Sequence, residues 1–434
     1  MMKILSILII VLLIICSFGV QGLFFEKTLE ETTNTGLGDF FLDLKISFLM
    51  KLFHYPSFSA CIIEEDEITW SNSYGYYDLE EMKPATVNTI YNIASITKTI
   101  TGTALMHLWE QGLFDLDGDV NNYLPFNLRN PYFPDDPITF RMLLSHSSSL
   151  NPDTWDYYRF DFSADPPFEN YPYPWLEEHL LPGGETYNPQ RWSNTYKPGE
   201  NCMYANVNFV IIAYLVELIS GENLVEYCKE HIFIPLEMYN TSFNLSELNI
   251  DNVAIPYHYH DGEYLHINEL SYIFGADTPP EKYWRNLHYP TGGVYSTISD
   301  LSHFLIVHMN NGVWNGVQIL EEDTIEVMHK VQPPGNPDQG TMYHGLAWIN
   351  FIDPLIFSFH ISGHGGDSFG SSTMMMYAPS EEIGIIHFTN GDRQFEENPL
   401  LLGYLSMILL LQLLFKKGGY NLFLHIDPGN FFGR

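Results

Sequence analysis

The sequence predicts a mixed α/β protein of the α+β kind, in which one antiparallel sheet is built from both ends of the chain, with helices flanking it and a mainly helical subdomain inserted. Three observations predict this class. Strand patterns occur near both ends of the 434-residue chain, helical patterns lie between them, and a hydrophobic fraction of 45% is typical of a folded protein with a large core.

The first strand pair is expected at residues 57–63 and 67–76, because both segments are rich in β-formers and the polar turn 64–66 separates them. A helix should follow, since residues 100–113 form an apolar run with helical spacing. Gly112 is expected to end that helix.

Helical patterns dominate the middle of the chain. The strongest is 204–220, where apolar residues recur with a period near 3.6 until Gly221 stops the helix. Shorter helices are expected at 138–144 and 222–232, and another at 300–311.

The C-terminal part should return to the sheet. Residues 357–361, 371–377 and 383–389 have the composition of three strands. The apolar segment 400–415 that follows is predicted to be a terminal helix packed on the sheet, with a short membrane span as the alternative.

Residues 151–199 are dense in Pro, Tyr, Trp, Phe and Asp and show little periodicity. They fit an aromatic lid over a site, or an irregular surface segment that packs its own aromatic side chains. The sequence alone leaves both interpretations open.

Four segments follow from these patterns: a signal peptide at 1–22, an N-terminal extension at 23–55, a main domain at 56–391, and an apolar helix with a tail at 392–434. Lys3, the apolar run 4–16 and the small residues before position 23 are typical of a cleaved secretory signal, although an uncleaved anchor is the alternative. We therefore expect a protein that is secreted or held in an endolysosomal lumen, with membrane association through either apolar segment as an open alternative.

Other features fit an exported protein but do not identify it. Asn240 and Asn244 each begin a glycosylation sequon. Without Cys16 of the signal, three cysteines remain, so one disulfide at most is expected. The net charge of −34 repels phosphate backbones and excludes nucleic acid as an expected partner.

The sequence contains one Ser-x-x-Lys tetrapeptide, Ser95-Ile96-Thr97-Lys98. Residues three apart lie on one helix face, so the hydroxyl and the amine should be neighbours. The helix dipole and burial both disfavour an ammonium at a helix start, and a neutral amine could take the serine proton. By chance alone a chain of this length holds about one such tetrapeptide, and a helix cap followed by a surface lysine is the structural alternative.

Two further motifs follow in the chain, Tyr204-Ala205-Asn206 and His364-Gly365-Gly366. With Ser95-x-x-Lys98, their order and spacing resemble the serine beta-lactamase and penicillin-binding-protein superfamily. The pattern is similar to that of class C beta-lactamases, D-Ala-D-Ala carboxypeptidases, family VIII esterases and eukaryotic beta-lactamase-related proteins.

The resemblance implies a role for each matched residue. Ser95 would be the nucleophile, and Lys98 and Tyr204 would share the proton transfers. Asn206 would orient the substrate and bond Lys98. The remaining substrate-binding positions would lie on one strand and are His364, Gly365, Gly366 and Asp367. Gly365 and Gly366 would admit the substrate. The Asp367 N–H would complete an oxyanion hole with the N–H of Ser95.

The implied activity is hydrolysis of an amide or ester in a small molecule or peptide through a Ser95 acyl-enzyme, with no cofactor and no metal. A catalytically silent binding protein on the same fold is the alternative. His364 stands where many beta-lactamases have lysine, so a substrate carboxylate should be held less strongly at neutral pH. Asp367 beside that strand is unfavourable for anionic substrates unless it points away.

The remaining histidines have weaker signals. His258, His260 and His266 lack strong metal-ligand spacing, and Gly363 argues against a helical zinc pair at His360 and His364. His146 falls near the implied site, where a structural role is expected.

Overall fold

A computed structural model describes residues 35–152, 173–266, 289–338, 342–352 and 360–392. The chain forms two compact units, residues 1–46 and 47–434, and helix α2 (Thr35–Leu52) crosses their boundary. That boundary lies inside the expected N-terminal extension. The expected signal peptide and the apolar segment 400–415 lie outside the described residues.

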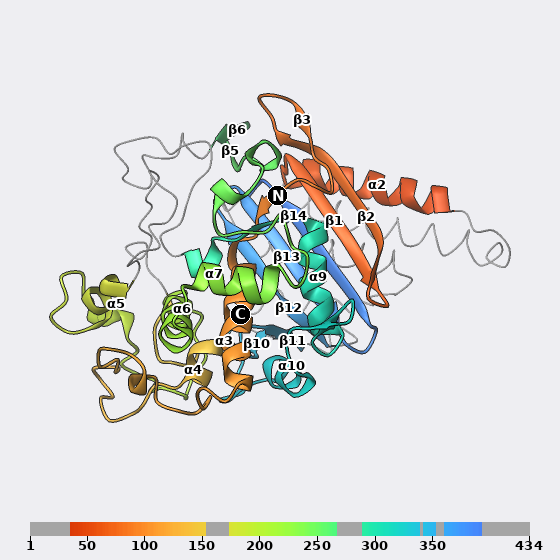
Figure 1. Ribbon diagram of the computed structural model, residues 1–434. Helices are drawn as coiled ribbons and strands as arrows, with labels where there is room; N and C mark the ends of the chain where they lie inside the picture. Colours follow the sequence, from red (N-terminus) through yellow and green to blue (C-terminus); the bar gives the residue numbers. More distant parts are fainter. Residues whose placement is uncertain (1–34, 153–172, 267–288, 339–341, 353–359, 393–434) are drawn as a thin grey trace, which may run out of the picture. The chain divides into compact units, whose positions relative to one another are not determined.

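The second unit contains one eight-stranded antiparallel sheet, with strand order β10-β11-β12-β13-β14-β1-β2-β3. Its strands are β1 (Ser57–Glu64), β2 (Glu67–Asp78), β3 (Lys83–Pro84), β10 (Met342–His344), β11 (Ile349–Phe351), β12 (Ile361–Ser368), β13 (Ser371–Ala378) and β14 (Ile383–Thr389). Figure 1 shows the early strands beside the late ones, because β1 pairs with β14 along its whole length. The predicted sheet from both ends of the chain is confirmed.

Eight α-helices of the described chain lie between β2 and β10. They are α3 (Thr97–Glu110), α4 (Phe140–Leu144), α5 (Tyr173–Leu180), α6 (Val207–Ser220), α7 (Leu224–Cys228), α8 (Tyr289–Gly292), α9 (Ile298–Met309) and α10 (Glu322–His329). Helix α9 packs against β1, β13 and β14, whereas α3 packs against α6, α7 and α8 (Figure 1). The short helical turns are η1 (Ala94–Ile96), η2 (Val120–Asn122), η4 (Pro189–Arg191), η5 (Lys229–Phe233), η6 (Leu245–Glu247) and η7 (Ile250–Asn252). Three small two-stranded sheets are β4–β7 (Tyr91–Asn92, Tyr295–Ser296), β5–β6 (Tyr257–His260, Glu263–His266) and β8–β9 (Val313–Trp314, Val317–Gln318).

Turn and capping residues explain where several of the strands and helices begin or end. Glu65 and Asp66 both have positive φ, which is the geometry of a tight hairpin turn between β1 and β2. The Thr297 hydroxyl caps α9 by accepting a hydrogen bond from the Asp300 N–H, and Gly221 ends α6 at φ +78°.

The strand expected at 357–361 is only partly supported. Residues 353–359 lie outside the described residues, and the observed strand β12 starts at Ile361 and continues through the glycines at 363, 365 and 366. Glycine has a low strand propensity, so a local pattern underestimates this strand, whereas pairing with β13 along its whole length stabilises it.

The aromatic segment 151–199 is partly described. Trp175 and Trp192 are buried in the main core, and the indole N–H of Trp192 donates to Leu180 O at 3.1 Å. The aromatic residues of this segment between 153 and 172 lie outside the described residues.

The three described cysteines, Cys61, Cys202 and Cys228, are all buried free thiols. Burial raises the pKa of the Cys202 thiol to about 12. Within the described ranges, no single helix has the length and apolar character needed to cross a membrane, although the pair Val207–Ser220 and Leu224–Phe233, bent by 80°, meets both criteria together.

Buried His308 and half-buried His329 link the helices to the sheet. His308 Nδ1 lies 3.1 Å from His329 Nε2, and His329 Nδ1 lies 2.9 Å from the Ser362 hydroxyl. Burial lowers the pKa of His329 to about 3 and holds the pKa of His308 well below its usual range. The folded protein therefore keeps both rings neutral.

We expect acid to destabilise the protein through these rings. An unfolded histidine takes up a proton below about pH 6.5. The contribution of these rings to the free energy of unfolding is thus greatest above that pH and falls as the pH drops below it, by up to about 1.4 kcal/mol per pH unit for each ring. For His329 this fall continues to its folded-state pKa of about 3. Urea unfolding of the wild type and of His308→Gln across this range should show a shallower pH slope in the variant. Exposed His260→Gln is the control, and an equal change of slope in both variants would contradict the expectation.

Candidate active site

Two hydroxyls of β13 hold the backbone that leads to Ser95. Ser371 Oγ donates to Asn92 O at 2.8 Å, and Thr373 Oγ1 donates to Ile93 O at 2.9 Å. Both acceptors are carbonyls just upstream of Ser95. The sheet therefore fixes the path of the chain directly before the candidate nucleophile.

The next residue turns the chain sharply. Ala94 has φ +45°, a region that residues with a side chain seldom adopt, and its N–H donates to Asn92 Oδ1 at 3.1 Å. Ser95 follows in the short turn η1, which continues directly into α3. This turn leaves Ser95 half-buried, while Ala94 and Ile96 on either side are buried.

Lys98 lies one turn beyond Ser95 and is completely buried, with 0% exposure. Its Nζ donates to Ser95 Oγ at 3.0 Å and to Thr291 O, in α8, at 2.7 Å. The same Nζ lies 5.2 Å from the centre of the Tyr204 ring. The predicted neighbourhood of Ser95 and Lys98 is thus present, within the distance range of a nucleophile and its base.

His146 holds the peptides on both sides of Tyr204. Its backbone O accepts from the Met203 N–H at 2.7 Å, and its ring Nδ1 accepts from the Ala205 N–H at 3.2 Å. The imidazole also stacks on the Tyr204 ring, with centroids 4.4 Å apart and planes 27° apart. His146 therefore restrains both the backbone and the ring of Tyr204.

The hydrogen bonds of His146 define its tautomer. The Ser148 hydroxyl donates to Asn208 Oδ1 at 2.6 Å, which leaves the Asn208 amide N–H to donate to His146 Nδ1 at 3.2 Å. With two donors at Nδ1, the ring proton belongs on Nε2. Burial, with nearby His344 and Lys98, holds the pKa of His146 well below its usual range, so this ring is neutral.

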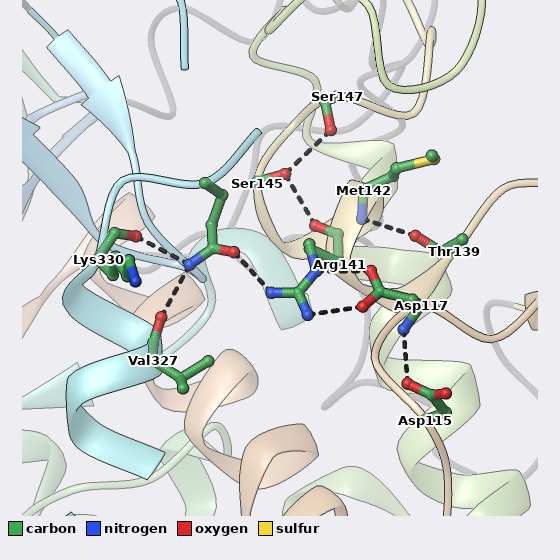
Figure 2. Close-up of polar contacts among 10 residues, drawn as sticks. Asp115, Asp117, Thr139, Arg141, Met142, Ser145, Ser147, Val327 and Lys330 are labelled. Atoms are coloured by element: carbon green, nitrogen blue, oxygen red, sulfur yellow. Dashed lines mark hydrogen bonds and ion pairs between the residues drawn. The ribbon is translucent and has the colours of Figure 1, made fainter. Parts of the chain in front are cut away.

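The helix that leads to His146 is anchored by Arg141 (Figure 2). The Arg141 guanidinium forms two bonds to the Asp117 carboxylate, at 2.7 and 2.9 Å, and one to Gln332 Oε1 at 2.7 Å. Beside it, Ser145 Oγ donates to Arg141 O at 2.8 Å. The guanidinium bonds tie α4 to the segment after α10, just before the chain turns at His146.

The third motif lies inside β12. Strand β11 pairs only with Ile361–Gly363, whereas β13 pairs with β12 along its whole length, so β11 leaves the edge of β12 open from His364 onward. The His364 ring lies 6.2 Å from the Tyr204 ring, centre to centre. Burial, followed by the Lys98 charge, lowers the pKa of His364 to about 3.

The two motif glycines have different surroundings. A Cβ on Gly366 would lie 2.4 Å from Ile93 O and 3.1 Å from Ala94 Cβ, so this glycine lets β12 approach the turn before Ser95. A Cβ on Gly365 would meet only Thr373 O, at 3.9 Å. Only Gly366 is thus required by the packing within the protein.

The last two predicted site residues are Asn206 and Asp367. Asn206 immediately precedes α6, two residues after Tyr204. Asp367 is exposed, and because side chains alternate along a strand, it projects from the opposite face to His364 and Gly366. The Asp367 carboxylate therefore points away from the His364 side of the sheet.

Sequence patterns missed two groups at the site. The Thr291 carbonyl that binds Lys98 is a backbone atom 193 residues away, so no side-chain pattern marks it. His344 is buried 5.0 Å from the His146 ring, and its Nε2 lies 3.3 Å from Asp338 Oδ2. Its position on the short strand β10 has no distinctive local signal.

Two of the histidines with weaker signals each contact a side chain from another segment. His258 lies on the β5–β6 hairpin with its Nδ1 2.7 Å from Asp392 Oδ2, and His360 Nε2 lies 2.7 Å from Asn350 Oδ1. In the part of the chain that the structure describes, no three His, Cys, Asp or Glu side chains are grouped as metal ligands. For the sequons, Asn240 is exposed, whereas the Asn244 side-chain oxygen is buried.

Comparison with known proteins adds independent information. The family model described as Beta-lactamase matches residues 46–403. The chain is 26% identical over 367 residues to Penicillin-binding protein 4* of Bacillus subtilis (strain 168), covering 80% of this chain and 71% of that protein. It is 27% identical over 344 residues to Beta-lactamase-like protein 2 of Dictyostelium discoideum, covering 76% of this chain and 55% of that protein.

Further matches agree. Protein flp of Staphylococcus aureus (strain MW2) is 22% identical over 346 residues, covering 79% of this chain and 61% of that protein. The chain thus spans between 55% and 71% of the length of these relatives. The octameric penicillin-binding protein homologue from Pyrococcus abyssi has a similar fold, with a TM-score of 0.65, 24% identity, and coverage of 89% of this chain and 78% of that one.

Proposed function

The chain belongs to the beta-lactamase family, and from this premise we propose that it is a serine hydrolase that cleaves an amide or ester bond through an acyl-enzyme on Ser95. The observation that carries the proposal is the 3.0 Å contact between Lys98 Nζ and Ser95 Oγ, with the lysine completely buried. A surface lysine after a helix cap, the structural alternative, would not be buried against the serine.

The proposed first step is attack of Ser95 Oγ on the substrate carbonyl while its proton moves to Lys98. The amine accepts this proton in its neutral form. The Thr291 carbonyl holds the amine in place at 2.7 Å. Tyr204, beside the same amine, then passes the proton to the leaving group.

The backbone N–H groups of Ser95 and Asp367 are proposed to bind the carbonyl oxygen as it becomes negative. Loss of one such donor typically costs about 2.7–4 kcal/mol of transition-state stabilisation. Asn206 is proposed to orient the substrate near Lys98. Water then attacks the acyl-enzyme by the same proton path in reverse, which releases the acid and restores Ser95.

A panel of nitrocefin, a p-nitrophenyl ester and a D-Ala-D-Ala peptide tests this proposal. We expect turnover of at least one of them, and mass spectrometry after treatment with a fluorophosphonate should place the adduct on the peptide that contains Ser95. Binding of these compounds without turnover and without an adduct would instead support a catalytically silent binding protein.

His146 should act as a positioning residue for Tyr204. His146→Phe keeps a ring against Tyr204 but removes the acceptor for the Ala205 N–H, whereas His146→Asn keeps an acceptor but removes the ring. We expect both variants to lower kcat by about tenfold or more, because a displaced proton donor is inefficient, with little change in KM. A change confined to KM would contradict this role.

The substrate is proposed to be a small molecule or a peptide, and the protein is proposed to be exported. Exposure of Asn240 is compatible with a glycosylated surface in such a compartment. Neither proposal depends on the catalytic assignments above.

A further inference from the structure

The ring of His364 presents an acceptor to the site, not a cation. Its Nδ1 lies 2.6 Å from Gly365 O, and because a carbonyl can only accept, Nδ1 carries the proton. In a neutral imidazole the other nitrogen, Nε2, is then an acceptor. Nε2 lies on the side of the ring away from the Gly365 carbonyl.

The ring is also held neutral by its surroundings. His364 is only 3% exposed, and this burial lowers the pKa of its ring. The Lys98 charge and His344 lower the pKa further, whereas the hydrogen bond to the Gly365 carbonyl raises it. The resulting pKa of His364 is about 3. At pH 5 to 8 the ring therefore offers no positive charge to a substrate carboxylate.

Among the described residues, no hydrogen-bond donor reaches His364 Nε2, although the side chain is almost fully buried. The ring stands beside Tyr204 and near Lys98, whose Nζ is bound to Ser95 and Thr291. A donor on the substrate would form a hydrogen bond with this acceptor.

The Arg141 guanidinium is not available to bind a substrate anion. Arg141, on the helix leading to His146, is bonded to Asp117 and Gln332 and is thus already neutralised (Figure 2). The net charge of −34 gives the protein as a whole a negative potential.

We propose that this site selects acyl substrates whose recognised group is uncharged and carries an N–H or O–H donor for His364 Nε2, and that it discriminates against substrates with a carboxylate at that place. This selectivity rests on the proposed function, since it concerns the same Ser95 site. It makes His364 a specificity-determining residue.

The test uses three p-nitrophenyl esters of equal chain length at pH 7.5. Hexanoate ends in a methyl group, adipamate in a carboxamide, and adipate in a carboxylate of nearly the same shape as the carboxamide. We expect kcat/KM for adipamate to exceed that for adipate by about tenfold or more, because one ester satisfies the acceptor and the other opposes it. An equal or higher value for adipate would overturn the proposal.

Two variants connect the preference to His364. The ratio of kcat/KM between adipamate and adipate is compared within each variant, which cancels a general loss of activity. His364→Leu should reduce the ratio, and His364→Lys should invert it. A ratio that stays at the wild-type value in His364→Leu would show that His364 is not the selecting group and would overturn the proposal.

Hexanoate distinguishes a failure of the proposed function from a failure of the proposed selectivity. Absence of Ser95-dependent turnover of every ester would count against the proposed function itself. Turnover of hexanoate without the expected ratio would count against the selectivity alone. Turnover of hexanoate by each His364 variant also confirms that the variant is folded.

Discussion

Ser95→Ala and Lys98→Met are each expected to lower kcat by about 10⁴-fold or more on any ester that the wild type hydrolyses. The first removes the atom that attacks, and the second removes the amine 3.0 Å from it without adding a charge to a fully buried site. Because the two groups act as one unit, the double variant should lose hardly more activity than either single variant.

Matched substitutions elsewhere control for general effects. Ser380→Ala removes an exposed hydroxyl and Lys197→Met removes a half-buried lysine's ammonium, and both should keep wild-type kcat. Labelling by a fluorophosphonate gives a second measurement, since it requires the nucleophile but no leaving-group protonation. Labelling or turnover at wild-type rates in Ser95→Ala would refute the assignment of the nucleophile.

Gly366→Ala is expected to reduce both stability and activity. The new Cβ would lie 2.4 Å from Ile93 O and 2.4 Å from Thr373 Oγ1, so β12 or the turn before Ser95 must shift. Overpacking of this kind costs about 1–3 kcal/mol of unfolding free energy. A shift of Ser95 of even 1 Å should lower kcat by about 10²-fold.

Gly365→Ala is the matched control for stability, because its Cβ would meet only Thr373 O at 3.9 Å. Urea unfolding should give it nearly the wild-type free energy of unfolding, while Gly366→Ala unfolds at lower urea. Equal destabilisation of the two variants would mean that the approach of β12 to Ile93 and Ala94 is not the reason for the glycine. A loss of kcat in Gly365→Ala without a loss of stability would indicate a role toward substrate instead.

Local patterns were reliable where neighbouring residues determine the structure. The hairpin around Glu65 and Asp66, the helix that ends before Gly112, and the helix capped by Gly221 all follow from signals within a few residues. Strand β12 was misplaced because its glycines weaken the local strand signal, while pairing with the distant β13 decides its length. Helix α6 begins at Val207, three residues later than expected, and His146 makes tertiary hydrogen bonds to Met203 and Ala205 just before it.

The sequence by itself determined the kind of fold, the motif order and the proximity of Ser95 to Lys98, because side-chain periodicity and i to i+3 spacing are local properties. Only the tertiary structure decided how that pair is used. The carbonyl that binds Lys98, the histidine that holds Tyr204 and the strand that requires Gly366 come from segments far away in the chain. These interactions depend on backbone atoms and on burial, which the amino-acid sequence does not show directly. The neutral ring of His364 is an example, because it depends on the exclusion of water around the ring and on the Gly365 carbonyl beside it.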